Sequence, residues 1–103
     1  MSQRDYRTET NSLPYVVSAG ESVQISPATA TSSRPRNYLI IQVTGLNAAV
    51  VNFGEPASAD QGITIGGGSD MSWTERVPQG SINIFSMAGT TISIIEGKSM
   101  ETR

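Results

Sequence analysis

Short runs of β-branched and aromatic residues recur along this chain at intervals of about 8–12 residues, with turn-forming residues between them. The strongest run is NYLIIQVTG, residues 37–45, whose middle is apolar at consecutive positions and therefore predicts a strand buried on both faces. No segment carries an apolar stripe with the helical period over the length of a helix. The pattern predicts an all-β fold, an antiparallel β-sandwich or jelly-roll-like domain of about eight short strands.

The expected strands are separated by residues typical of turns. They cover residues 15–19, 22–26, 37–45, 48–54, 63–65, 71–73, 81–87 and 90–97. Gly20-Glu21 and Leu46-Asn47 leave gaps of the length of a hairpin turn between successive strands. The segment PATATSSRPR, residues 27–36, is a loop rich in Pro, Ser and Thr that cannot be helical.

The chain has 103 residues, which is enough for one hydrophobic core and too few for two. Residues 14–97 are expected to form the β-sandwich domain. Residues 1–13 are polar and show no periodicity, so they are expected to form an extended N-terminal arm. Residues 98–103 are expected to form a C-terminal tail.

Composition limits the classes of function. The net charge is −2, so the chain lacks the positive field that dominates nucleic-acid binding, and no nucleic-acid partner is expected. There is no cysteine and no histidine, which removes disulfides, thiolate metal sites and the commonest general base. Neither a cofactor nor a metal is expected. The polar start is unlike a signal peptide, and no stretch approaches the ~20 apolar residues of a membrane span, so we expect cytoplasmic synthesis and no membrane partner.

The segment ITIGGGSDMSW, residues 63–73, contains the one motif that suggests nucleotide binding. A P-loop needs a lysine after its glycines and a helix that begins there, whereas Gly68 is followed by Ser69 and Asp70. The glycines are instead expected to form a tight turn between two strands.

Four acidic residues lie in or beside this glycine-rich region: Glu55, Asp60, Asp70 and Glu75. A pair of them could serve glycoside hydrolysis, and Asp60 with Asp70 could bind Ca²⁺. A thin sandwich offers little cleft and the EF-hand spacing is absent, so we favour solvated loop acids. Serine and threonine nucleophiles lack a histidine to activate them, and Lys98 lies in the expected tail. We therefore expect a protein that is not an enzyme.

Basic and aromatic side chains are the candidates for binding a partner protein. These candidates are Arg4, Tyr6, Arg7, Arg34, Arg36 and Trp73. They fall mostly in residues 1–13 and 27–36, which we expect to reach neighbouring chains. Tyr38 is expected in the core, whereas Trp73 fits either the core or an interface.

The last two-thirds of the chain resembles small virion proteins from the structural modules of tailed bacteriophages. The recurring text is R-x-Y-L-x-I-Q, V-x-N-F-G, A-x-x-x-x-G-I-x-I, a glycine-rich turn, an aromatic residue, V-P-x-G-x-I and A-G-T. In this chain these are Arg36 to Gln42, Val51 to Gly54, Ala57 to Ile65, Gly66 to Gly68, Trp73, Val77 to Ile82 and Ala88 to Thr90.

The resemblance implies a capsid decoration (cement) protein, or a minor head or tail protein, with no catalytic residue. It implies that the protein is located in the virion, at the capsid surface, after synthesis in the host cytoplasm. The implied partners are the major capsid protein and neighbouring copies of the chain, in a homo-oligomer such as a trimer. The alternative is a tail or fibre-tip module that recognises a host surface glycan through Trp73 and the loop acids.

Overall fold

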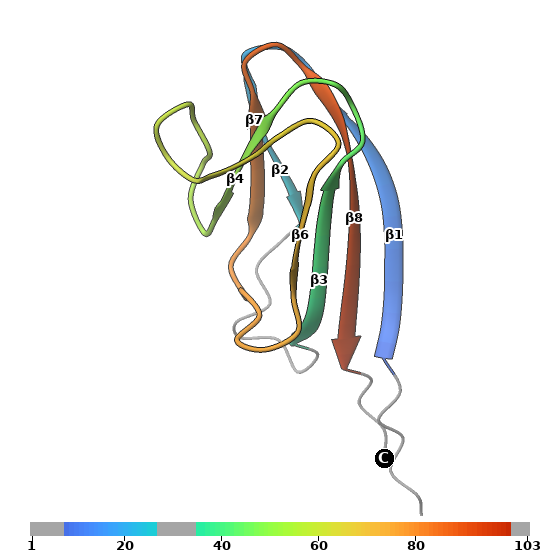
Figure 1. The fold of residues 1–103 in the computed structure, drawn as a ribbon. Helices are drawn as coiled ribbons and strands as arrows, with labels where there is room; N and C mark the ends of the chain where they lie inside the picture. The colour runs from blue at the N-terminus through green and yellow to red at the C-terminus, as the bar shows by residue number, and fades with distance from the viewer. Residues whose placement is uncertain (1–7, 27–34, 100–103) are drawn as a thin grey trace, which may run out of the picture.

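The computed structural model describes residues 8–26 and 35–99. These residues form eight strands and no helix, which confirms the all-β prediction and the expected number of strands (Figure 1). The strands are β1 (Thr8–Val17), β2 (Glu21–Ser26), β3 (Arg36–Val43), β4 (Ala49–Phe53), β5 (Ile63–Ile65), β6 (Asp70–Trp73), β7 (Ile82–Ser86) and β8 (Thr90–Ser99).

The strands form two antiparallel sheets of four strands that pack face to face. One sheet has the order β1-β8-β3-β6 and is called the β1 sheet; the other has the order β2-β7-β4-β5 and is called the β2 sheet. The pairing is nested, since β1 pairs with β8, β2 with β7, β3 with β6 and β4 with β5. This nesting is the jelly-roll arrangement, so the jelly-roll alternative of the prediction is the observed one.

The expected hairpin turns join strands of different sheets. The turns at Gly20 and at Leu46-Asn47 carry the chain from the β1 sheet to the β2 sheet, and glycines 66–68 carry it back. The hairpin interpretation is therefore wrong at Gly20 and at Leu46-Asn47, whereas the tight turn between two strands expected at the glycines is observed. Spacing alone cannot tell a hairpin from a corner between sheets, because both need only a few turn residues.

The strands extend further at both ends of the chain than the sequence indicated. β1 pairs with β8 without interruption from Thr8↔Ser99 to Val17↔Thr90, so residues 8–13 belong to the sheet and not to an arm. Lys98 and Ser99, assigned to the tail, are likewise part of β8. Strand propensity depends on the neighbouring strand, so a polar segment becomes an edge strand once β8 lies beside it.

The space between the sheets is filled by aliphatic side chains. The buried cluster consists of Val17, Leu39, Ile41, Val43, Ala49, Val51, Ile65, Ile82, Ile84, Ile92 and Ile94. In β3, Leu39 and Ile41 are buried, whereas Tyr38 and Ile40 alternate with them and stay partly exposed. The expectations of a strand buried on both faces and of Tyr38 in the core are therefore wrong, because a two-layer sandwich leaves one face of each sheet in water.

Candidate functional site

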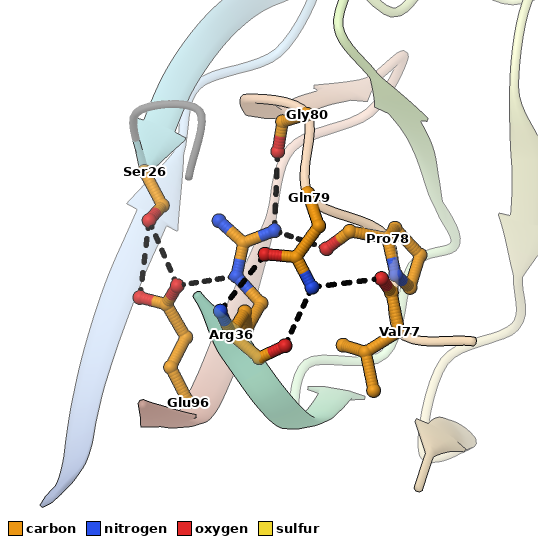
Figure 2. Close-up of polar contacts among 7 residues, drawn as sticks. All are labelled: Ser26, Arg36, Val77, Pro78, Gln79, Gly80 and Glu96. Carbon is orange, nitrogen blue, oxygen red and sulfur yellow. Dashed lines mark hydrogen bonds and ion pairs between the residues drawn. The ribbon is translucent and has the colours of Figure 1, made fainter. Parts of the chain in front are cut away.

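The described connections between strands lie toward different ends of the sandwich (Figure 1). Four short connections, residues 18–20, 44–48, 66–69 and 87–89, meet at one end, which we call the neutral end. The other end holds a buried polar cluster formed by Ser26, Arg36, Gln79 and Glu96 (Figure 2).

An ion pair forms the centre of the polar cluster. The Arg36 Nε donates a hydrogen bond to Glu96 Oε2 at 2.7 Å, and both side chains are almost fully covered. The Ser26 hydroxyl lies 3.0 Å from each oxygen of the same carboxylate. Because Ser26 comes from the β2 sheet and the other two residues from the β1 sheet, the cluster links the sheets at this end (Figure 2).

Two β-bulges place these side chains in the interior. The register shifts between Arg36 and Tyr38 where β3 meets β8, and between Gln24 and Ser26 where β2 meets β7. A bulge adds one residue to one strand and thereby turns the following side chains to the other face. Without its bulge, Arg36 would follow the alternation of Leu39 and point into solvent.

The connection between β6 and β7 closes over the cluster (Figure 2). The Arg36 Nη1 donates to the carbonyl oxygens of Pro78 and Gly80, the latter at 3.1 Å. Gln79 Oε1 accepts from the Arg36 backbone N–H at 2.8 Å, and Gln79 Nε2 donates to the Arg36 and Val77 carbonyl oxygens. This connection is therefore held by one arginine through both its side chain and its backbone.

The structure changes the interpretation of Arg36. It was expected to contact a partner, but it is only 2% exposed and its guanidinium is engaged inside its own chain, so that expectation is wrong. Its place at the end of the expected polar loop, residues 27–36, predicts an exposed side chain, and no local pattern of residues indicates the bulge. Arg4, Tyr6, Arg7 and Arg34 lie outside the described residues.

Trp73 packs at the side of the sandwich that is bounded by β5 and β6. Its ring meets Phe53 of the opposite sheet edge-to-face, with centroids 5.4 Å apart and an interplanar angle of 88°. Trp73 is half-buried against the aliphatic cluster. Of the two roles left open by the sequence, the structure places it at the margin of the core.

The neutral end is a set of connections tied to one another. Thr44 and Gly45 both donate backbone hydrogen bonds to the Thr91 carbonyl oxygen, at 2.9 and 3.0 Å. Asn47 Nδ2 donates to the Gly89 carbonyl oxygen at 2.8 Å, which joins the β3–β4 and β7–β8 connections. The Gly67 backbone is so close to the Leu46 carbonyl that an added Cβ would lie 2.1 Å from its oxygen. The end is therefore built from rigidly cross-linked turns.

Apolar side chains project from this end into solvent. Leu46 is 98% exposed and Met87 is 69% exposed, and Val16, just before the β1–β2 turn, is 80% exposed. None of the residues in the four connections is charged. Three of the four large hydrophobic side chains that are exposed among the described residues therefore lie at or next to this end.

The acidic residues considered for catalysis or Ca²⁺ binding lie at the surface of the domain. Glu55, Asp60, Asp70 and Glu75 are all exposed. Across residues 8–26 and 35–99, no group of three or more His, Cys, Asp or Glu side chains lies close enough to hold a metal ion. Within the same part of the chain, no helix has the length and apolar character needed to span a membrane.

No protein-family model matches the chain, and no curated protein matches it in sequence. Solved structures match its fold. A protein of Bacillus endospore appendages, from a family of disulfide-linked pili, is 17% identical over 99% of this chain and 93% of its own, with a TM-score of 0.67.

Two further structures are more distant. A conserved Streptococcus pyogenes protein of unknown function is 7% identical over 98% of this chain and 76% of its own, with a TM-score of 0.53. A cupin-2 domain protein of Shewanella frigidimarina is 16% identical over 91% and 78%, with a TM-score of 0.51. At these identities the likeness shows a shared jelly-roll architecture.

Proposed function

We propose that this protein is a non-enzymatic structural subunit that works through its surfaces within a larger protein assembly. The observation that carries the proposal is the interior: the space between the sheets is filled by the aliphatic cluster. The ionic and hydroxyl groups of Ser26, Arg36 and Glu96 in the interior are engaged with one another and with backbone carbonyls. The described residues available to a ligand or partner therefore lie on the outer surfaces, as is typical of structural subunits.

We further propose that the assembly is the head of a tailed bacteriophage, where the protein decorates the capsid surface and bridges neighbouring capsid subunits. The resemblance over residues 36–90 supports this proposal. Its R-x-Y-L and V-P-x-G elements meet in the structure, since Arg36 of the first donates to the carbonyls of Pro78 and Gly80 in the second. The shared pattern thus includes residues that hold the fold together. The surface residues outside the pattern can then differ from one virion protein to another.

In this proposal the partners are the major capsid protein and neighbouring copies of the chain. Residues 1–7, with Arg4, Tyr6 and Arg7, supply part of the contact with the shell. Each added interface raises the barrier to shell rupture, and many copies on one shell multiply the effect.

The experiment is co-sedimentation of the purified chain with empty phage shells, followed by heating of the decorated and bare particles. We expect saturable binding and rupture at a higher temperature for decorated shells. The triple variant Arg4→Ala/Tyr6→Ala/Arg7→Ala should bind less, whereas Arg76→Ala, which removes an exposed arginine from the β6–β7 connection, should bind normally. Absence of saturable binding by the unaltered chain would contradict the proposal.

A second candidate is a subunit that polymerises with its own copies, as the pilus protein of similar fold suggests. The outer edge of β1 favours it, because this strand has ten residues in regular register. The other edge strands are shorter: β2 has six residues and a bulge, β5 has three and β6 has four. Among the described residues no strand pairs with this edge, and such an edge can accept a strand from another chain. The chain has no cysteine, so such a polymer would lack disulfide links.

Electron microscopy of the concentrated chain tests this second candidate. Proline has no backbone N–H, so Pro14 fits in β1 at a position whose nitrogen faces away from β8. Alternate residues of an antiparallel strand direct their N–H groups to the same side, so the N–H groups of the other even-numbered residues of β1 also face outward. Ser12→Pro should therefore remove an outward donor and abolish filaments without unfolding the domain. Filaments that persist in this variant would exclude the β1 edge as the joint.

A further inference from the structure

We infer that the neutral end is a self-association surface, through which two copies of the chain pack end to end. This inference adds to the proposed function the surface through which copies of the chain associate, and it does not depend on the identity of the particle. It rests on the exposure, the rigidity and the charge of the four connections.

The first observation is where the exposed apolar side chains lie. Among the described residues, four large hydrophobic side chains are exposed, and Val16, Leu46 and Met87 are at the neutral end, with only Ile63 elsewhere. A leucine that is 98% exposed contributes nothing to the packing of its own domain. Removing such side chains from water on association is favourable in proportion to the area covered.

The second observation is that these side chains are presented by a rigid support. The Asn47–Gly89 hydrogen bond and the close approach of Gly67 to Leu46 fix the β3–β4 connection from two sides. The hydroxyl of Ser86, the last residue of β7, donates to the Ala48 carbonyl oxygen at 2.8 Å and holds the end of the same connection. A surface that is already ordered loses little conformational entropy on binding, so more of the apolar contact appears as affinity.

The third observation, charge, favours a second copy as the partner. The chain is acidic overall, and across a two-fold axis a charged surface meets its own charges. The four connections carry no charge, so two neutral ends meet without like charges in the contact. Glu21 and Asp70, the first residues of β2 and β6, remain at the rim, where water and salt screen them.

Sedimentation velocity of the full chain from micromolar to millimolar concentration tests the inference. We expect a concentration-dependent dimer. Leu46→Asp and Met87→Asp should each raise the dimer dissociation constant by at least about tenfold, because each brings a like charge into a neutral contact. Ala59→Asp adds the same charge to the exposed β4–β5 connection and should leave the constant unchanged.

A charge exchange tests whether the two neutral ends face each other. A mixture of Leu46→Asp and Leu46→Lys chains should form dimers more readily than either variant alone, since the opposite charges then share one interface. Higher salt should strengthen or leave unchanged the dimer of the unaltered chain, because it screens Glu21 and Asp70. Thermal unfolding of each variant should match that of the unaltered chain, as residue 46 is exposed.

Three results would overturn the inference. The unaltered chain could remain monomeric at every concentration, association could persist in both aspartate variants, or the mixed variants could dimerise no better than the separate ones. None of these results bears on shell binding, which the co-sedimentation experiment measures separately.

Discussion

The Nε atom of Arg36 and a carboxylate oxygen of Glu96 lie 2.7 Å apart in the interior between the two sheets. Glu96 reaches this place by the ordinary alternation that also buries Ile92 and Ile94, whereas Arg36 reaches it through the bulge in β3. A buried pair of this kind adds little net stability over an apolar pair, but losing one partner leaves an uncompensated buried charge. Its function is therefore to hold the loops and the two sheets in one arrangement.

Arg36→Met should reduce the free energy of unfolding by about 3–5 kcal/mol, because it leaves Glu96 buried without a cation. Urea denaturation followed by tryptophan fluorescence measures this, since Trp73 is the single tryptophan. Arg76→Met, at an exposed arginine, should change stability by no more than about 0.5 kcal/mol.

The double variant Arg36→Met/Glu96→Met should be more stable than Arg36→Met alone, because no charge then remains buried. A double variant that is less stable than the single one would show that the hydrogen bonds to the β6–β7 connection, and not the charge pair, dominate.

The three successive glycines at 66–68 should respond differently to alanine. Gly67→Ala should cost about 1–3 kcal/mol, because its Cβ would collide with the Leu46 carbonyl. Gly68→Ala should cost about 1–2 kcal/mol through its positive φ. Gly66→Ala, whose nearest neighbour is the Ser69 hydroxyl at 3.8 Å, is the matched control and should be nearly neutral. Equal melting temperatures for the three variants would contradict this account.

Phe53 and Trp73 should be energetically coupled. In a double-mutant cycle with Phe53→Leu and Trp73→Leu, we expect a coupling free energy of about 0.5–1.5 kcal/mol from the edge-to-face contact. Chemical denaturation monitored by circular dichroism is suitable, because the variants lose the fluorescent reporter. Strictly additive losses would show that the two rings contribute only separate burial.

Replacing Arg76 with glycine should increase the stability of the protein. Its φ of 52° lies in the left-handed region, which costs a non-glycine residue about 1–2 kcal/mol. Part of this gain is offset by the greater freedom of glycine in the unfolded chain, so Arg76→Gly should add roughly 0.5 kcal/mol. Arg76→Val should destabilise, because a β-branched side chain tolerates this conformation poorly. A loss of stability in Arg76→Gly would mean that the arginine side chain has a stabilising contact.

Local pattern predicted the strands of the core well. The apolar alternation around Ile82–Ser86 and Thr90–Ser99 identifies β7 and β8, because a strand of a sandwich buries every second residue. Residues 8–13 of β1 were not expected to form a strand, because they are polar and lack alternation. They do so by pairing with β8, and a single sequence contains no signal for a distant partner strand.

The sequence by itself determined the all-β class, the approximate number of strands, the turn at the glycines and the absence of cysteine and histidine chemistry. These follow from local periodicity and composition. The tertiary structure decided which turns cross between sheets, that Arg36 points inward, and that Leu46 and Met87 lie at the same end of the sandwich. Each of these depends on contacts between residues far apart in the chain. The inward position of Arg36 also depends on a bulge, whose loss of regular strand pairing is offset by those contacts.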